Sequence, residues 1–144
     1  MTDVLRRAAL ATLIHQQQER DAQAKYELAV VITDDDALQE LNRRFRGVDA
    51  PTDVLAFPND TRGPFVEVPG LPYYLGDIVI SFHRAEAQAA EAGHSVEAEL
   101  QLLVVHGVLH LLGHDDTEPE PRAVMWAAQA AILKALKVHV NLPD

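Results

Sequence analysis

Apolar residues recur at intervals of three and four positions in five segments of the chain, which is the spacing of one helix face. Three of the predicted helices begin after a residue whose side-chain oxygen can cap a helix N-terminus, namely Asp34, Ser81 and Ser95. Pro119 marks the start of the last helix. The five predicted helices cover residues 4–20, 36–45, 82–92, 96–112 and 119–137.

The same periodicity predicts which side of a helix faces the core. In the second helix, Leu38, Leu41 and Phe45 fall on one face. In the last helix, Met125 and Trp126 are interpreted as packing residues rather than base-stacking groups. That helix is also predicted to turn four apolar residues inward: Val124, Ala128, Ile132 and Leu136.

Short runs rich in β-branched residues predict strands over residues 26–33, 52–57 and 75–81. Residues 58–72 are rich in proline and glycine and are predicted to form a long irregular loop. The order of the elements indicates an α+β fold in which a small mixed sheet is covered by helices. Because 48% of the 144 residues are hydrophobic, we expect a single domain over residues 1–144.

Composition and charge narrow the classes of function. The chain has no cysteine, which excludes disulfides and thiolate metal sites and fits a cytoplasmic protein. Its longest apolar run, residues 100–112, is too short to span a bilayer, so no membrane association is expected. The net charge of −10 argues against non-specific nucleic-acid binding through bulk electrostatics, but it is compatible with a local basic site.

The candidate chemistry lies in residues 105–116, where histidines interrupt an apolar run. His106 and His110 are four residues apart, so on a helix they project from one face and can reach one metal ion. Gly113 suits the positive φ with which many helices end, and the acidic residues after it can return toward the pair. Those carboxylates would supply either a third ligand or a hydrogen-bond acceptor for an imidazole. Three protein ligands and one open position form the catalytic arrangement of zinc.

Other polar residues have simpler explanations. His83 and His94 are predicted to be surface or capping residues. Thr52, Asp53 and Asp77 lie close to the starts of strands, where such residues usually cap or turn the chain; lining of the active-site cleft is the less favoured alternative. None of these five residues is therefore expected to carry the chemistry.

Four segments together resemble the YbeY family of bacterial ribosomal-RNA maturation factors. Residues 106–116 are similar to the family signature H-G-x-L-H-L-x-G-[Y/H]-D-H, and the other segments cover residues 41–46, 49–58 and 75–80. The resemblance spans residues 26–135. It implies a metal-dependent endoribonuclease that cuts single-stranded RNA in small-subunit ribosomal-RNA processing and ribosome biogenesis. The implied partners are ribosomal RNA and the small subunit or its assembly proteins.

The resemblance also implies a third metal ligand, at a position where this chain departs from the family. The family's third zinc-binding histidine falls ten residues after the first, and Asp116 occupies that position here. A carboxylate can take the same tetrahedral corner, so we expect His106, His110 and Asp116 to bind one Zn²⁺ ion. His114 is the alternative ligand if the loop follows another path. Two histidines and one carboxylate also suit iron or manganese.

A local cluster of cations on this acidic chain provides the expected contact with RNA. Arg43, Arg44 and Arg46 supply positive charge of the kind that a phosphodiester needs in its transition state. For Arg43 and Arg44, the solvated face of an amphipathic helix is an equally good interpretation. By the resemblance, Arg46 matches the arginine that the family places in its active-site cleft. Arg46 and His106 are therefore the expected catalytic residues.

Two other functions remain open on the sequence alone. A non-catalytic ribosome-assembly factor would use the metal only to hold its fold, and a fourth protein ligand should then close the site. A zinc peptidase also carries two histidines four residues apart, but its glutamate general base would stand where this chain has Gly107. Gly107 is expected instead to leave room above the metal for a bulky polymeric substrate.

Overall fold

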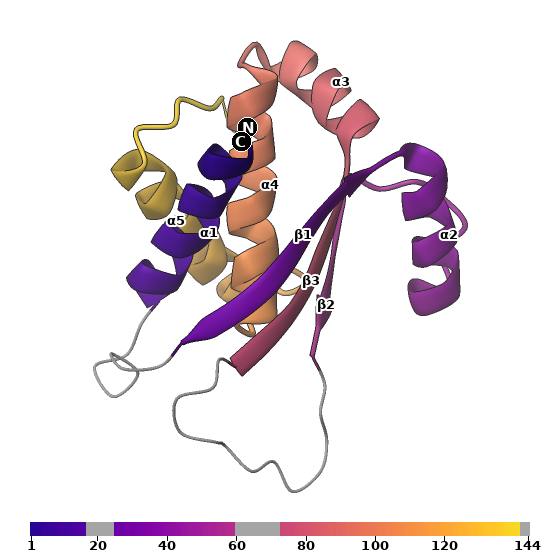
Figure 1. Ribbon diagram of the computed structural model, residues 1–144, viewed down its shortest axis with the longest axis horizontal. Helices are drawn as coiled ribbons and strands as arrows, with labels where there is room; N and C mark the ends of the chain where they lie inside the picture. The colour runs from indigo at the N-terminus through magenta and orange to yellow at the C-terminus, as the bar shows by residue number, and fades with distance from the viewer. Residues whose placement is uncertain (17–24, 60–72, 142–144) are drawn as a thin grey trace, which may run out of the picture.

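The computed structural model describes residues 1–16, 25–59 and 73–141. In these residues the chain forms five helices around one three-stranded sheet (Figure 1). The elements follow one another in the predicted order. They are α1 (Thr2–Gln16), β1 (Tyr26–Thr33), α2 (Asp35–Arg46), β2 (Val54–Pro58), β3 (Tyr73–Ser81), α3 (Phe82–Ala92), α4 (Val96–Leu111) and α5 (Pro119–Ala135).

The element boundaries agree with the prediction to within a few residues. β1 and α3 have the predicted bounds, and the other elements shift by a few residues at one end or both. Residues 17–20, which were predicted to extend the first helix, lie outside the described residues, as does most of the predicted loop over residues 58–72. In the part of the chain that is described, no helix has the length and apolar character needed to cross a bilayer.

The sheet is mixed, with strand order β1-β3-β2. β1 runs parallel to β3 and β2 runs antiparallel to it, which confirms the predicted α+β class. Because β3 is central, its side chains alternate between two covered faces. Ile78 and Ile80 belong to the main core. Val79 packs on the opposite face, with Leu38 of α2 and Leu55 of β2.

Helix α4 is the centre of the main core. Figure 1 shows it between the sheet and the helices α1 and α5, with α2 alone on the far side of the sheet. Burial of a Val or Leu side chain stabilises a fold by about 1.5–3 kcal/mol. The helix that carries the two histidines is therefore held firmly by its packing. Its fully buried residues are Leu100, Val104, Val105, Val108 and Leu109.

Gly107 lies on the sheet side of α4, and the expectation that it opens space above a metal is wrong. A Cβ atom at this position would stand 2.8 Å from Cγ2 of Ile78, closer than side chains normally approach. The glycine thus lets α4 pack closely on β3. Gly107 directly follows His106, so it lies on the helix face next to the one that carries the histidines. That neighbouring face of α4 packs on the sheet.

Side-chain caps begin α2, α3 and α4 as predicted. Asp34, Ser81 and Ser95 each accept a hydrogen bond from the backbone N–H three residues further on, at 2.8, 3.2 and 3.0 Å. Ser81, the last residue of β3, also donates to Oδ1 of Asp35 at 2.6 Å, which joins the start of α3 to the start of α2. This hydrogen bond lowers the pKa of the Asp35 carboxyl, and the nearby Arg84 guanidinium lowers it further.

Some predicted inward-facing residues are exposed instead. Phe45 is 62% exposed and packs only at the surface, with its ring centroid 5.2 Å from that of Phe57. On α5, Val124 is 61% exposed and Trp126 is 40% exposed, so both predictions are wrong. Helix α5 is apolar on nearly every side, and the periodicity could not choose between neighbouring stripes. Its buried residues are Met125, Ala128, Gln129, Ile132 and Leu133.

Candidate metal centre

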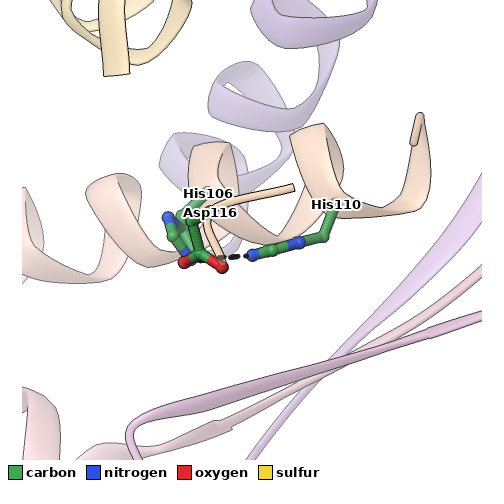
Figure 2. A group of neighbouring side chains, drawn as sticks. All are labelled: His106, His110 and Asp116. Carbon is green, nitrogen blue, oxygen red and sulfur yellow. Dashed lines mark hydrogen bonds and ion pairs between the residues drawn. The ribbon is translucent and has the colours of Figure 1, made fainter. Parts of the chain in front are cut away.

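Two histidines of α4 and one carboxylate from the following loop come together at the surface of the core (Figure 2). His106 and His110 project from adjacent turns of the helix, and their Nε2 atoms are 3.1 Å apart. Helix α4 ends at Leu111, and Gly113, at φ +100°, turns the chain back as predicted. The returning loop places Oδ2 of Asp116 3.6 Å from both Nε2 atoms.

Hydrogen bonds on the far side of each ring fix which nitrogen faces the cluster. Nδ1 of His110 lies 3.1 Å from the backbone carbonyl of His114, which can only accept, so Nδ1 carries the proton. Nδ1 of His106 lies 3.1 Å from Oε1 of Gln129, another carbonyl oxygen. In the neutral rings, both Nε2 atoms are then unprotonated. Two nitrogen lone pairs and a carboxylate oxygen converge on one point, which is a cation-binding arrangement.

The dimensions of this group fit a metal ion. Ligand atoms at about 2.0–2.1 Å from a tetrahedral zinc are separated by roughly 3.3 Å. The 3.1 and 3.6 Å separations between the three ligand atoms are close to that value. Among the described residues, only these three side chains form such a group, and no fourth His, Cys, Asp or Glu joins them there. Two imidazoles and one carboxylate suit zinc, and also iron or manganese.

The electrostatics of His106 favour the form that binds a cation. Burial lowers the pKa of the His106 imidazole, and the neighbouring His110 lowers it further, against smaller raising effects of Gln129 and Asp116. His106 is therefore neutral at pH 7, and its contact with Asp116 is not an ion pair between two charged groups. A neutral imidazole keeps the Nε2 lone pair that a metal requires.

The other two polar residues of the loop point elsewhere. Nε2 of His114 lies 2.7 Å from Oε1 of Gln16 on α1, so its ring is outside the group and only its carbonyl serves His110. Asp115 accepts hydrogen bonds from the backbone N–H and the hydroxyl of Thr117, at 2.9 and 2.8 Å. Asp115 therefore stabilises the turn, and Asp116 is the carboxylate that the loop presents to the histidines.

Gln129 is a member of the candidate site that the sequence did not predict. It is only 5% exposed and lies on the inner face of α5, one turn after Met125. A buried amide needs a hydrogen-bond partner, and here the partner is the His106 ring. The only signal in the sequence was a polar residue at a core position, since nothing in the sequence shows that residues 106 and 129 meet.

Replacing Gln129 with leucine is expected to weaken metal binding by about 10- to 100-fold, because His106 loses the acceptor that fixes its tautomer and ring orientation. Metal affinity can be measured by competition with a chromogenic chelator. The matched control is Gln101→Leu, because Gln101 is also buried, on α4, but among the described residues its amide bonds to the backbone of Glu97 and not to the metal group. Equal losses in both variants would contradict a specific role for Gln129.

The arginines lie on α2, on the opposite face of the sheet from α4, and the structure does not bring them into contact with the histidines (Figure 1). Arg43 forms an ion pair with Glu40 at 2.7 Å. The guanidinium of Arg44 stands 5.7 Å from the centroid of the Phe45 ring. For Arg46, no described residue provides an ion-pair partner. Arg46 is thus the cation of this cluster that is most available to a phosphate.

A cavity of about 650 Å³ opens beside His106, between α3, α4 and α5. His94 lies in its wall, and its side chain is only 3% exposed, so the surface position is wrong. The predicted alternative, a capping role, is met by its backbone N–H, which bonds to the carbonyl of Ala89 in α3 at 3.1 Å. Its Nδ1 accepts from the Asn141 N–H at 3.0 Å, so the proton is on Nε2, which lies 3.1 Å from Oε1 of Glu99. Burial raises the pKa of the Glu99 carboxyl.

Asp53, which was predicted to cap a strand, accepts a hydrogen bond from the Val54 N–H at 2.8 Å. Asp53 also lines this cavity.

Known proteins resemble the chain over most of its length. A family model described as "Endoribonuclease YbeY" matches residues 2–137. The protein named endoribonuclease YbeY from Roseiflexus castenholzii is 55% identical over 117 residues, which are 81% of this chain and 74% of that protein. The one from Chloroflexus aggregans is 50% identical over 135 residues, 92% of this chain and 86% of that protein. The solution structure of TM1509 from Thermotoga maritima has a TM-score of 0.58 at 24% identity, covering 94% of this chain and 79% of that one, and shows the same fold.

Proposed function

The chain belongs to the YbeY endoribonuclease family, and on that premise we propose that it is a metal-dependent endoribonuclease specific for single-stranded RNA. We further propose that it acts in small-subunit ribosomal-RNA processing. The observation that carries the metal dependence is the convergence of His106, His110 and Asp116. Their three electron-rich atoms lie within 3.6 Å of one another, and a cation offsets their mutual repulsion.

In this proposal the three residues hold one divalent ion, with Zn²⁺ as the first choice, in a zincin-like pair of histidines spaced by three residues. The ion supplies Lewis acidity, which polarises a phosphoryl oxygen and lowers the pKa of a water. The protein residues hold that chemistry in place. Gln129 and the His114 carbonyl orient the rings, and the packing of α4 fixes the distance between them.

Arg46 is proposed to meet the RNA backbone at the edge of the sheet. β2 is an edge strand, and α2 and α4 pack on its two faces. Phe45, next to Arg46, packs on Phe57 of β2, while Gly107 of α4 packs on Ile78, the register partner of Ala56 in β2. A single-stranded RNA that crosses the sheet at β2 passes both α2 and α4. Arg46 then stabilises a phosphate, and Arg43 is weakened for that role by its ion pair with Glu40.

The alternatives are less well supported. A structural site normally closes with four protein ligands, whereas three described side chains converge here. This favours catalysis over a ribosome-assembly factor that uses metal only to fold. A zinc peptidase needs a glutamate beside the first histidine. The residue there is Gly107, which is packed against Ile78 and leaves no space for such a side chain.

The family assignment also supports the remaining parts of the proposal. Residues 1–144 are proposed to act as one catalytic domain in the cytoplasm, with ribosomal RNA as substrate and the small ribosomal subunit or its assembly proteins as partners. Because the net charge of the chain is −10, its overall electrostatic field does not attract RNA. In this proposal the attraction comes from local cations and from the metal.

Metal removal tests this function. The purified chain is expected to bind about one zinc ion and to cut a single-stranded RNA, and exhaustive chelation should lower cleavage by at least about 100-fold. Adding zinc back should restore cleavage, and a duplex of the same sequence should resist it. His110→Ala, purified in parallel, controls for contaminating nucleases. A fully metallated wild type that cuts RNA no faster than His110→Ala would favour the assembly-factor alternative.

A further inference from the structure

The cavity beside His106 has the chemistry of a nucleobase site rather than a phosphate site. Three acidic residues line it, namely Asp53, Glu91 and Glu99, and no Lys or Arg is among the described residues of its wall. A phosphate would be repelled by this wall. A neutral planar group is not repelled, and its amino hydrogens can be donated to the carboxylates of Asp53 and Glu91, since Glu99 is already bonded by His94.

Trp126 provides a stacking surface at the same cavity. Its side chain is 40% exposed, although it lies next to the fully buried Met125 on α5. The indole centroid is 5.9 Å from that of His106, and the two ring planes meet at 70°. A large aromatic side chain left open to solvent beside a candidate catalytic centre is suited to stack on a base of a single strand.

The size of the cavity and its position agree with this role. A volume of about 650 Å³ is within the range of small-molecule pockets and exceeds what one base needs. Because His106 is both a member of the metal group and part of the cavity wall, a base held here belongs to a nucleotide close to the bond that is cut.

We propose that this cavity is a nucleobase subsite, in which a base of the RNA strand stacks on Trp126 and the acidic wall selects bases that carry an exocyclic amino group. Uracil has a single carbonyl oxygen, O4, where cytosine has its amino group, and the acidic wall repels that oxygen. The inference rests on the proposed function, because it takes single-stranded RNA as the substrate.

Trp126 is the single tryptophan of the chain, so its fluorescence reports on the subsite directly. The zinc-loaded protein is titrated with cytidine, adenosine and uridine, which contain no phosphodiester bond and cannot be cut. We expect saturable quenching, with cytidine and adenosine binding at least about fivefold more tightly than uridine. N-acetyltryptophanamide is the control for collisional quenching. Quenching that is linear and equal to that of the control would overturn the proposal.

Variants of Trp126 test the same subsite through RNA cleavage. Trp126→Ala is expected to raise KM for a single-stranded RNA by about 5- to 150-fold, and Trp126→Phe should retain most of the affinity. Both variants should keep the wild-type zinc content. An unchanged KM in Trp126→Ala, or a loss of zinc from it, would overturn the base-binding role. If the nucleosides bind as expected but the wild type cuts no RNA, the proposed function fails while the base subsite stands.

Discussion

Asp116→Asn is expected to lower both zinc affinity and RNA cleavage by at least about 100-fold, whereas Asp115→Asn should keep both near the wild-type values. Loss of an outer-shell partner already costs about 10- to 100-fold in metal affinity, and loss of a ligand costs more. Oδ2 of Asp116 is 3.6 Å from both Nε2 atoms, and the amide that replaces it carries no charge to offset a cation. Zinc competition and a single-turnover cleavage assay measure the two effects.

The two variants form a matched pair. They make the same chemical change in neighbouring residues of one loop, but Asp115 accepts its hydrogen bonds from Thr117 and not from the metal group. Equal losses in both would mean that the loop, rather than one ligand, was damaged. Retention of zinc in Asp116→Asn would point to the His114 ring, which would then have to leave Gln16 on α1. His114→Ala in the Asp116→Asn background distinguishes that case.

The part of the site that follows from local geometry could be predicted from the sequence. The spacing of His106 and His110 and the turn at Gly113 depend only on helix geometry, and both are found as expected. The third carboxylate required more, because helix spacing alone could not choose between Asp115 and Asp116. Only the resemblance to a family singled out Asp116.

Contacts between distant segments could not be predicted. Gln129 meets His106 across 23 residues, and His114 meets Gln16 across 98, so neither pair has a periodic signature. The cap residues were easier, because each acts on a backbone N–H three residues away. The orientation of α5 was missed because an alanine-rich helix with several apolar stripes shows its buried side only in the packed structure.

Gly76→Ala is expected to destabilise the fold by roughly 2–5 kcal/mol, the largest loss of stability that we predict for a single methyl group. Gly76 has φ +143°, where a side chain is strained by about 1–2 kcal/mol. A Cβ would also overlap the backbone oxygen of Phe57 and stand 2.9 Å from Cδ2 of Leu111, which adds an overpacking cost of about 1–3 kcal/mol. Urea denaturation of the wild type and the variant measures the difference.

Gly47→Ala is the control for backbone strain alone, because Gly47 has φ +71° and a Cβ there meets nothing within 4 Å. We expect it to cost only about 1–2 kcal/mol. Equal losses in the two variants would remove the packing argument. Gly76 lies between the edge strand β2 and Leu111, the residue that follows His110 at the end of α4. A displaced α4 terminus moves His110 relative to His106, so Gly76→Ala should also weaken zinc binding, whereas Gly47→Ala should leave it unchanged.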